Sequence, residues 1–217
     1  RTPNAQGTAQ ILDAARAAGV QRTVWASSSA VYGDCPDVPA REERLGTPLS
    51  PYAASKLAAE GFAAERAVHG QEIVALRYFN VYGPRQDPNG PYAAVVPRFL
   101  AALAAGEPPV IYGDGEQTRD FLFVADAVRA NLLAAGAPAG AAAGFAYNVA
   151  SGRATRIRDL ATIAARVRGG GPPPVFAAAR PGEVQHSLGD PTRFRTEIGD
   201  LELTALEAGL AKCLRGL

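Results

Sequence analysis

Helical and apolar extended segments alternate along the N-terminal part of this chain. A helical pattern covers residues 6–18 and ends at Gly19, and the apolar strand 23–27 follows it. A second helix is expected at 52–69, and the apolar strand 73–77 comes next. Crossover helices between successive strands make those strands run parallel in one sheet. This order of segments predicts an α/β fold with a doubly wound parallel sheet.

The pattern changes after residue 83, where shorter segments alternate with loops rich in proline and glycine. The segments expected here are helices at 95–105, 125–135, 157–167 and from 204 on, and strands at 110–112, 121–124 and 145–149. They predict a smaller C-terminal α/β lobe that follows the sheet in the chain.

The composition of the 217 residues argues against several classes of partner. Lys and Arg number 22 against 21 Asp and Glu, without a run of one sign, so the electrostatic footprint for nucleic acid is missing. No apolar stretch reaches the roughly 20 residues of a membrane span. Cys35 and Cys213 lack metal-ligand spacing, which predicts no metal site and two unpaired thiols in a cytoplasmic protein. A small molecule is therefore the expected ligand.

Tyr52 and Lys56 share one face of their predicted helix, because they lie four residues apart. A phenol is a poor base at neutral pH unless a nearby cation stabilises the phenolate, and an ammonium group can do so. Seven Tyr and two Lys give a chance expectation of about 0.06 such pairs, so coincidence is the weaker alternative. The chain otherwise uses arginine for nearly all its positive charge, and lysine offers a compact ammonium that arginine lacks. The pair predicts a proton-transfer site.

Three serines, Ser27, Ser28 and Ser29, stand where the strand 23–27 ends. Ligands bind at the carboxyl edge of open α/β sheets, so a catalytic hydroxyl is one interpretation. Serines at a strand end are also common turn formers, and these residues alone do not decide between the two.

Ordered motifs connect these residues to a known family. They read SSSAVYG at 27–33, SPYAASK at 50–56, LRYFNVYGPR at 76–85 and GDGEQTRDF at 113–121, with NAQGT at 4–8 and RPGE at 180–183. In this order and spacing they resemble the extended short-chain dehydrogenase/reductase family of NAD-dependent sugar epimerases and dehydratases. The resemblance runs over nearly the whole chain. It implies NAD as cofactor, a nucleotide-sugar substrate and a homodimer.

The resemblance also implies roles for individual residues. In a triad of Ser28, Tyr52 and Lys56, Tyr52 would accept the proton of the sugar hydroxyl, Ser28 would relay or orient that proton, and Lys56 would hold the nicotinamide ribose. The cofactor contacts it implies are those of Asn4, Ser27, Tyr52, Lys56 and Tyr78. The substrate contacts it implies are those of Ser28, Asn80, Arg119, Arg180, Glu183 and Ser187. The arginines suit the diphosphate, although a surface ion pair with Asp120 is the alternative for Arg119.

By the same resemblance, residues 1–82 are the C-terminal part of an NAD-binding Rossmann-like domain that carries the catalytic residues. Residues 83–217 correspond mainly to the sugar-nucleotide-binding lobe, with some segments that return to the Rossmann sheet. The family's glycine-rich dinucleotide fingerprint is not in this chain, which contains no methionine and opens at Arg1 within a structural unit. We therefore expect a sheet incomplete at the N-terminus, and a chain that by itself binds NAD weakly and is inactive.

The residues after Ser28 bear on the reaction. The family's 4,6-dehydratases follow the catalytic hydroxyl with an Asp-Glu pair, because loss of water needs an acid and a base. Ser29 and Ala30 stand at those positions, so the expected activity is that of a UDP-glucose/UDP-galactose 4-epimerase. Another dehydratase or reductase of the family and a non-catalytic nucleotide-binding homologue stay open.

The resemblance also implies a residue that controls the size of the sugar pocket. Ser187 stands where relatives restricted to plain hexoses have a bulky tyrosine, so it would admit the N-acetyl forms of these UDP-sugars. Its alternative role is to cap a turn.

Overall fold

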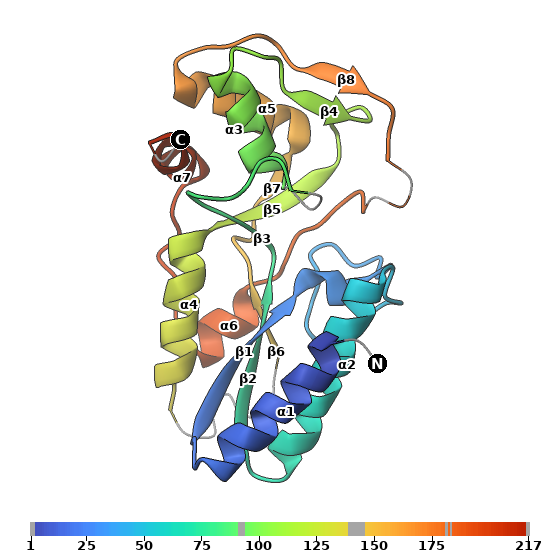
Figure 1. The fold of residues 1–217 in the computed structure, drawn as a ribbon, viewed down its shortest axis with the longest axis vertical. Helices are drawn as coiled ribbons and strands as arrows, with labels where there is room; N and C mark the ends of the chain where they lie inside the picture. Colours follow the sequence, from blue (N-terminus) through green and yellow to red (C-terminus); the bar gives the residue numbers. More distant parts are fainter. Residues whose placement is uncertain (1–2, 91–93, 139–145, 181, 183, 216–217) are drawn as a thin grey trace.

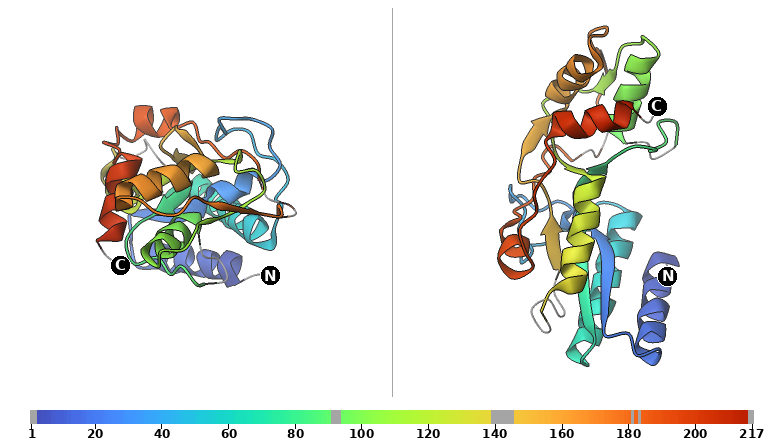
Figure 2. Two further views of the ribbon diagram at one scale, coloured as in Figure 1. Left: turned by 90° about the horizontal axis from the view of Figure 1, so that it is seen from above. Right: turned by 90° about the vertical axis from the view of Figure 1, so that its left-hand side faces the viewer.

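The computed structural model describes residues 3–90, 94–138, 146–180, 182 and 184–215 (Figure 1). The molecule is elongated, with a lobe that contains the longest strands at one end and a second lobe at the other (Figures 1 and 2). Short strands in the middle of the molecule connect the two lobes (Figure 1).

The predicted parallel sheet forms the first lobe. β1 (Arg22–Ser28) pairs in parallel with β2 (Glu72–Tyr78), and β2 pairs in parallel with β6 (Ala146–Val149). The strand order is β1-β2-β6. In this register Ser28 lies opposite Tyr78. Because parallel strands end at the same edge of a sheet, these two residues meet at the carboxyl edge.

Helices cover both faces of this sheet. α2 (Pro51–Val68) packs on β1 and β2 from one side, with α1 (Pro3–Ala17) beside it. α4 (Val124–Gly136) packs on the same strands from the opposite side (Figure 2), and α6 (Thr192–Glu197) contacts β6. A sheet covered on both faces is what the alternating pattern predicts for a doubly wound fold.

The second lobe is built on shorter strands. β3 (Asn80–Tyr82) pairs in parallel with β5 (Thr118–Phe123), which pairs antiparallel with β7 (Ala154–Arg156). β4 (Val110–Tyr112) pairs in parallel with β8 (Val175–Ala177). The helices of this lobe are α3 (Val95–Ala104), α5 (Ile157–Arg168) and α7 (Leu206–Leu214). A smaller α/β lobe is therefore present, but α4 and β6, which the sequence pattern placed in it, belong to the first lobe together with α6, because α4 packs on β1 and β2 and β6 pairs with β2.

Several short elements were not predicted from the sequence. They are β3, β7, β8, α6 and the 3-10 turn η1 (Ser29–Tyr32). Each spans three to six residues, which is too short for alternation or helical periodicity to stand out. The start of α2 also differs: it begins at Pro51, because the Ser50 hydroxyl accepts a hydrogen bond of 3.1 Å from the Ala53 N–H and caps the helix.

Each lobe has its own apolar cluster. In the second lobe Tyr82 is buried, and its ring meets the edge of Phe123 with 5.6 Å between ring centroids, near the buried Leu160. In the first lobe Tyr147 and Phe194 meet edge to face with 6.3 Å between ring centroids. These clusters hold the strands whose ends carry the candidate site. Within the described ranges, no helix is long and apolar enough to cross a membrane.

Candidate functional site

A cleft of about 470 Å³ lies where the carboxyl ends of β1 and β2 meet the second lobe. It is lined by five of the residues predicted for the site: Ser28, Tyr78, Asn80, Arg119 and Ser187. They come from four separate segments, so only the tertiary fold brings them together. A cleft at this edge is the expected ligand position in an open α/β sheet.

Tyr52 and Lys56 lie at the start of α2, beside this cleft. The Lys56 ammonium donates a hydrogen bond of 2.8 Å to the Ala26 carbonyl at the end of β1 and lies 5.8 Å from the centroid of the Tyr52 ring. Burial lowers the pKa of Lys56. Tyr52 itself is 50% exposed, and its neighbours Ser50 and Ala53 line the cleft. The arrangement places a cation beside an accessible phenol, as the four-residue spacing predicted.

The Ser28 hydroxyl is fixed by the turn that follows it. Its oxygen accepts a hydrogen bond of 3.2 Å from the Ala30 N–H and so caps η1. The O–H proton can still donate to a ligand in the cleft. Ser28 therefore acts both as a turn former and as a cleft residue, and the two alternatives considered for these serines do not exclude each other.

The neighbouring Ser27 has a different environment from the one predicted. Its side chain is buried, and its hydroxyl donates to the carboxylate of Glu60 on α2 rather than pointing into the cleft. Adjacent residues of a strand point to opposite faces, which explains why Ser28 and Ser27 differ. A cofactor contact by the Ser27 hydroxyl does not fit this geometry.

Asn80, Ser187 and Tyr78, which were predicted to contact the ligands, all line the cleft. The Asn80 amide donates a hydrogen bond of 3.1 Å to the Asp120 carbonyl, and the Ser187 N–H donates one of 3.1 Å to the Thr118 carbonyl. Burial raises the pKa of Tyr78 at the edge of β2. Asn4 falls in the first turn of α1 with its side chain outside the part of the chain described, and Glu183 is also outside the described residues.

A second, smaller hollow adjoins the cleft and gathers arginine side chains. It has a volume of about 90 Å³ and is lined by Arg98, Arg119 and Arg180 around Tyr112. The Arg180 guanidinium lies 3.8 Å and that of Arg98 5.7 Å from the centroid of the Tyr112 ring. Hydrogen bonds from Arg180 and Arg98 lower the pKa of the Tyr112 phenol. Planar guanidinium groups beside an aromatic ring suit a ligand that carries both phosphate groups and a base.

Arg119 lies at the junction, because it lines both hollows. Its guanidinium donates to the carbonyls of Thr118 at 2.8 Å and Gln185 at 3.3 Å. Asp120 is fully buried and accepts hydrogen bonds from the Ser151 N–H and hydroxyl, so the alternative of a surface ion pair between Arg119 and Asp120 is wrong. Arg119 is therefore held by backbone carbonyls at the position where the two hollows meet.

Two residues of the second hollow, Arg98 and Tyr112, were missed by the sequence analysis. Arg98 is a charged residue in the apolar helix VVPRFLAALA, which was a weak signal in itself. Tyr112 ends a three-residue strand and gave no signal. Among the residues described, no group of three or more His, Cys, Asp and Glu side chains could hold a metal ion, and both cysteines are free.

The cleft also offers groups that fit part of a nicotinamide cofactor. The Lys56 ammonium and the exposed Tyr52 phenol lie next to the open carboxyl edge of the sheet and would hold the hydroxyls of a ribose. Tyr78 lies at the same edge and would pack near the nicotinamide. The fit concerns the nicotinamide end alone, since the donors for a pyrophosphate belong to a glycine-rich turn that this chain does not contain.

Comparison with known proteins identifies the family. Residues 2–150 match the model of the NAD dependent epimerase/dehydratase family. The chain belongs to this family, whose cofactor is NAD, and this confirms the resemblance seen in the motifs.

Individual relatives are similar over most of the chain. The UDP-glucose 4-epimerase of Mycolicibacterium smegmatis is 42% identical over 213 residues, which cover 97% of this chain and 67% of that protein. The solved UDP-N-acetylglucosamine 4-epimerase from Methanobrevibacter ruminantium M1, in complex with UDP-N-acetylmuramic acid, has a TM-score of 0.91 and 37% identity over 97% of this chain and 67% of that one. MoeE5 in complex with UDP-glucuronic acid and NAD has a TM-score of 0.84 and 37% identity over 96% and 68%.

The relatives also include proteins with other activities. They comprise a dTDP-glucose 4,6-dehydratase of Streptomyces niveus and a UDP-N-acetyl-alpha-D-glucosaminuronate decarboxylase of Bacillus cytotoxicus. The chain spans 58% of the putative UDP-glucose 4-epimerase of Methanocaldococcus jannaschii, and about two thirds of the Mycolicibacterium smegmatis protein and of the two solved structures described above. Relatives in this family therefore carry names of several different reactions on nucleotide sugars.

Proposed function

We propose that this protein is a 4-epimerase that interconverts UDP-glucose and UDP-galactose and also acts on their N-acetyl forms. The observation that carries the proposal is the Lys56 ammonium beside the Tyr52 phenol at the end of the strand that presents Ser28. The names of the two 4-epimerases described above, at 42% and 37% identity, support the same reaction class.

The chemistry removes a proton from the hydroxyl and a hydride from the carbon at one sugar position and then returns both, the hydride to the opposite face of that carbon after the ketone has rotated. Bound NAD supplies the hydride acceptor and donor. Tyr52 accepts the proton of the sugar hydroxyl and later returns it, while the nearby Lys56 charge stabilises the phenolate. Ser28 orients the hydroxyl through its free O–H. Epimerisation requires no further acid or base.

The nucleotide end of the substrate would occupy the second hollow. Arg98, Arg119 and Arg180 give the hollow its positive charge, and the Tyr112 ring offers an aromatic face. Arg119 connects this hollow to the cleft that contains Ser28, so a diphosphate there would leave the sugar next to the catalytic residues. The UDP-sugars named for the relatives support such a ligand.

The alternative activities, a dehydratase, a non-catalytic homologue and a reductase, would each need different side chains or a different use of the cofactor. A dehydratase needs an acid and a base for the loss of water, and the Ser29 and Ala30 side chains after Ser28 supply neither. A non-catalytic homologue would tolerate damage at Ser28, Tyr52 or Lys56, and all three are present. A reductase would use the same triad and would differ in using the cofactor stoichiometrically.

An assay of the full-length protein separates these activities. Incubated with NAD and UDP-galactose, it is expected to produce UDP-glucose up to the equilibrium ratio, without net formation or consumption of NADH. Chromatography follows the sugars, and absorbance follows the cofactor. A 4-keto-6-deoxy product would show a dehydratase, and stoichiometric formation of NADH a reductase that runs in the oxidative direction. Binding of UDP-sugar without turnover would show a non-catalytic homologue.

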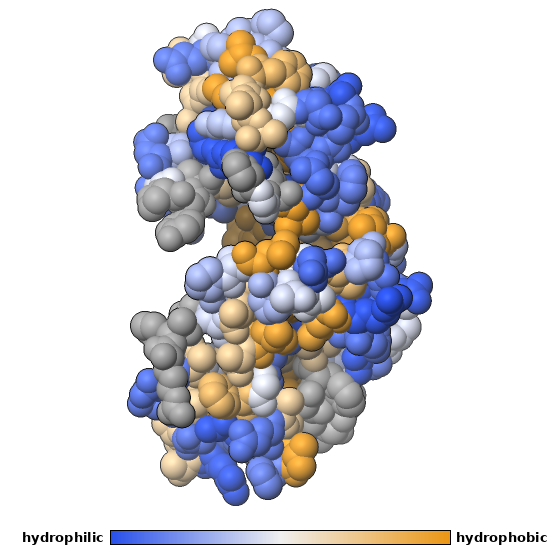
Figure 3. All heavy atoms as spheres, turned by 90° about the vertical axis from the view of Figure 1, so that its right-hand side faces the viewer, coloured by the Kyte–Doolittle hydropathy of each residue, from blue (hydrophilic) through white to orange (hydrophobic). Residues whose placement is uncertain are grey.

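We also propose that the full-length protein is a cytoplasmic homodimer that pairs through α1 and α2. An apolar groove of about 590 Å³ runs between these helices and is lined mostly by small side chains, including Ala9, Ala54 and Ala58, with Phe62 at one end. Ile11 on α1 is 67% exposed. Figure 3 faces this side of the molecule and shows apolar side chains among polar ones on the first lobe, which carries α1 and α2. Small residues would allow close helix packing between two copies.

Ala58→Arg is expected to convert the dimer into a monomer, because it introduces a charged side chain into the centre of the apolar groove. Sedimentation velocity at several concentrations measures the change. Val175→Arg, at an exposed site on β8 in the other lobe, is the control and is expected to leave the dimer intact. A dimer that persists in Ala58→Arg, or an unmodified protein that is monomeric, would contradict this interface.

A further inference from the structure

A buried ion pair joins the helix of the candidate site to its sheet. Glu60 lies one turn after Lys56 on α2, and its carboxylate accepts hydrogen bonds from Arg77 Nε at 2.9 Å and from Arg77 Nη2 at 2.7 Å. The same carboxylate accepts a hydrogen bond from the Ser27 hydroxyl. The exposed fraction is 4% for the Arg77 side chain and 10% for that of Glu60. A two-point contact of this kind fixes both the distance and the direction between α2 and the strands.

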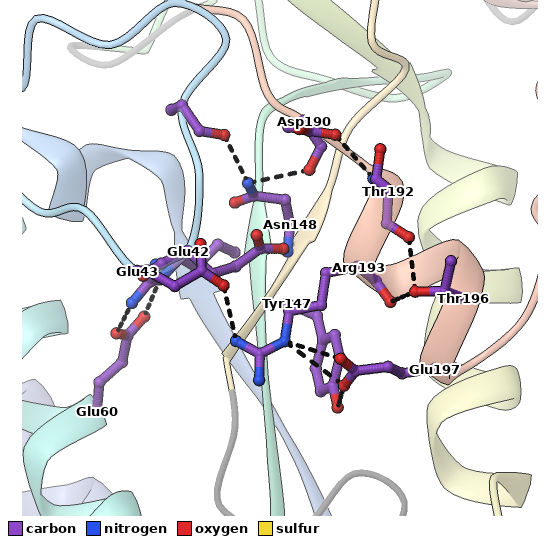
Figure 4. A network of polar contacts seen from close by, with 12 residues as sticks. Glu42, Glu43, Glu60, Tyr147, Asn148, Asp190, Thr192, Arg193, Thr196 and Glu197 are labelled. Atoms are coloured by element: carbon purple, nitrogen blue, oxygen red, sulfur yellow. Dashed lines mark hydrogen bonds and ion pairs between the residues drawn. The ribbon is translucent and has the colours of Figure 1, made fainter.

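The ion pair continues into a network of polar contacts that extends to Asn148 and Asp190 (Figure 4). Arg77 Nη1 donates to the Tyr32 hydroxyl at 3.1 Å, and that hydroxyl donates to Asn148 Oδ1 at 2.5 Å. Asn148 Nδ2 in turn donates to the Asp190 carbonyl at 3.2 Å (Figure 4). Asp190 follows Ser187 by three residues. The network thus contacts β1, α2, β2, η1 and β6, and the segment that carries Ser187.

Members of this network are neighbours of the proposed catalytic residues. Ser27 directly precedes Ser28, and Glu60 shares a helix face with Lys56 four residues before it. We propose that Glu60 is a positioning residue: through Ser27 and Arg77 it sets the placement of α2 against the ends of β1 and β2, and with it the separation of the Tyr52 and Ser28 hydroxyls. This inference rests on the proposed function.

The expected kinetic signature follows from the position of Glu60. Proton transfer requires heavy-atom separations of about 2.6–3.2 Å, and a misplacement of about 1 Å can cost on the order of 100-fold in rate. The arginines proposed for the nucleotide lie in the second hollow, which α2 does not line. Loss of the Glu60 contacts should therefore change kcat and leave KM for the UDP-sugar nearly constant.

Glu60→Gln in the full-length enzyme is expected to lower kcat by about 10- to 50-fold, with KM for UDP-glucose within about two-fold. Glutamine keeps the shape of the side chain and removes its charge. Glu60→Asp keeps the charge on a shorter side chain and is expected to recover part of the lost kcat. A wild-type kcat in Glu60→Gln, or a rise in KM equal to the fall in kcat, would overturn the proposal.

Two further variants distinguish a loss of positioning from a general loss of folding. Apolar replacement of both partners of a buried ion pair is often tolerated, so Glu60→Met/Arg77→Met is the variant most able to fold without these contacts. A folded double variant with reduced kcat supports positioning, and one with wild-type kcat overturns it. Glu197→Gln is the matched control, because the Glu197 carboxylate also accepts a hydrogen bond from a hydroxyl, that of Tyr147 at 2.7 Å, and pairs with Arg193 at 3.3 Å. It should keep its kcat, and a loss equal to that of Glu60→Gln would overturn the proposal.

A readout that needs no turnover separates this inference from the proposed function. Lys56 and Lys212 are the two lysines of the chain, and the Lys56 ammonium is held on the Ala26 carbonyl. If Glu60 holds α2 in place, Glu60→Gln should make Lys56 react several-fold faster with an amine-directed reagent, while Lys212 reacts as before. Peptide mass mapping measures both sites. Unchanged Lys56 labelling would overturn positioning by Glu60, whereas absence of UDP-sugar interconversion by the unmodified protein would refute the proposed function alone.

Discussion

Replacing Tyr52 with phenylalanine is expected to lower kcat of the full-length protein on the order of 10³-fold, while KM for the UDP-sugar stays within about two-fold. The substitution removes the proton acceptor and keeps the ring, whose centroid lies 5.8 Å from the Lys56 ammonium. Tyr52 is 50% exposed, so loss of its hydroxyl leaves no buried group without a partner. Steady-state rates in both directions measure the effect.

Tyr82→Phe provides the matched control for Tyr52→Phe. The Tyr82 hydroxyl donates a hydrogen bond of 3.3 Å to the Leu206 carbonyl in the core of the second lobe. Its loss should lower the free energy of unfolding by about 1 kcal/mol and leave kcat close to that of the unmodified protein. If Tyr52→Phe lost only a few-fold in kcat, Tyr52 would not be the proton acceptor and the proposed mechanism would be wrong.

The parts of the fold that the sequence predicted depend on local periodicity. α2 and the buried β2 each extend over enough residues for their patterns to be clear, and their alternation required a parallel sheet. The contact between Tyr52 and Lys56 followed from helix geometry, because residues four apart lie on one face. The position of Ser28 at the carboxyl edge followed from the end of its strand.

The parts that were missed depend on contacts between distant segments. Glu60 and Arg77 read as ordinary charged residues, and only the packing of α2 on β2 buries their ion pair. Tyr112 and Arg98 meet because β4 and α3 fold into one lobe. The burial of Ser27 could have been anticipated, because adjacent strand residues face opposite ways and Ser28 already faces the cleft.

If Ser187 in the wall of the cleft sets the substrate range as proposed, Ser187→Tyr should narrow that range. The change should lower kcat/KM for the N-acetylated UDP-sugars by about 100-fold and leave UDP-glucose and UDP-galactose within about five-fold. Ser187 lines the same cleft as Ser28, and its N–H donates to the Thr118 carbonyl at 3.1 Å, which fixes the backbone there against β5. A phenol ring at this position would fill volume that the serine leaves to a 2-acetamido group.

The alternative role of Ser187 as a turn cap predicts a different pattern. In that case Ser187→Ala would lower the free energy of unfolding by about 1 kcal/mol, and Ser187→Tyr would affect both classes of sugar equally. As a gate, Ser187→Ala keeps a small side chain and should leave the ratio of the two kcat/KM values unchanged, whereas Ser187→Phe should exclude the N-acetyl forms as tyrosine does. If the unmodified enzyme already rejects the N-acetyl sugars, the gate lies elsewhere, because a serine cannot supply the bulk that excludes them.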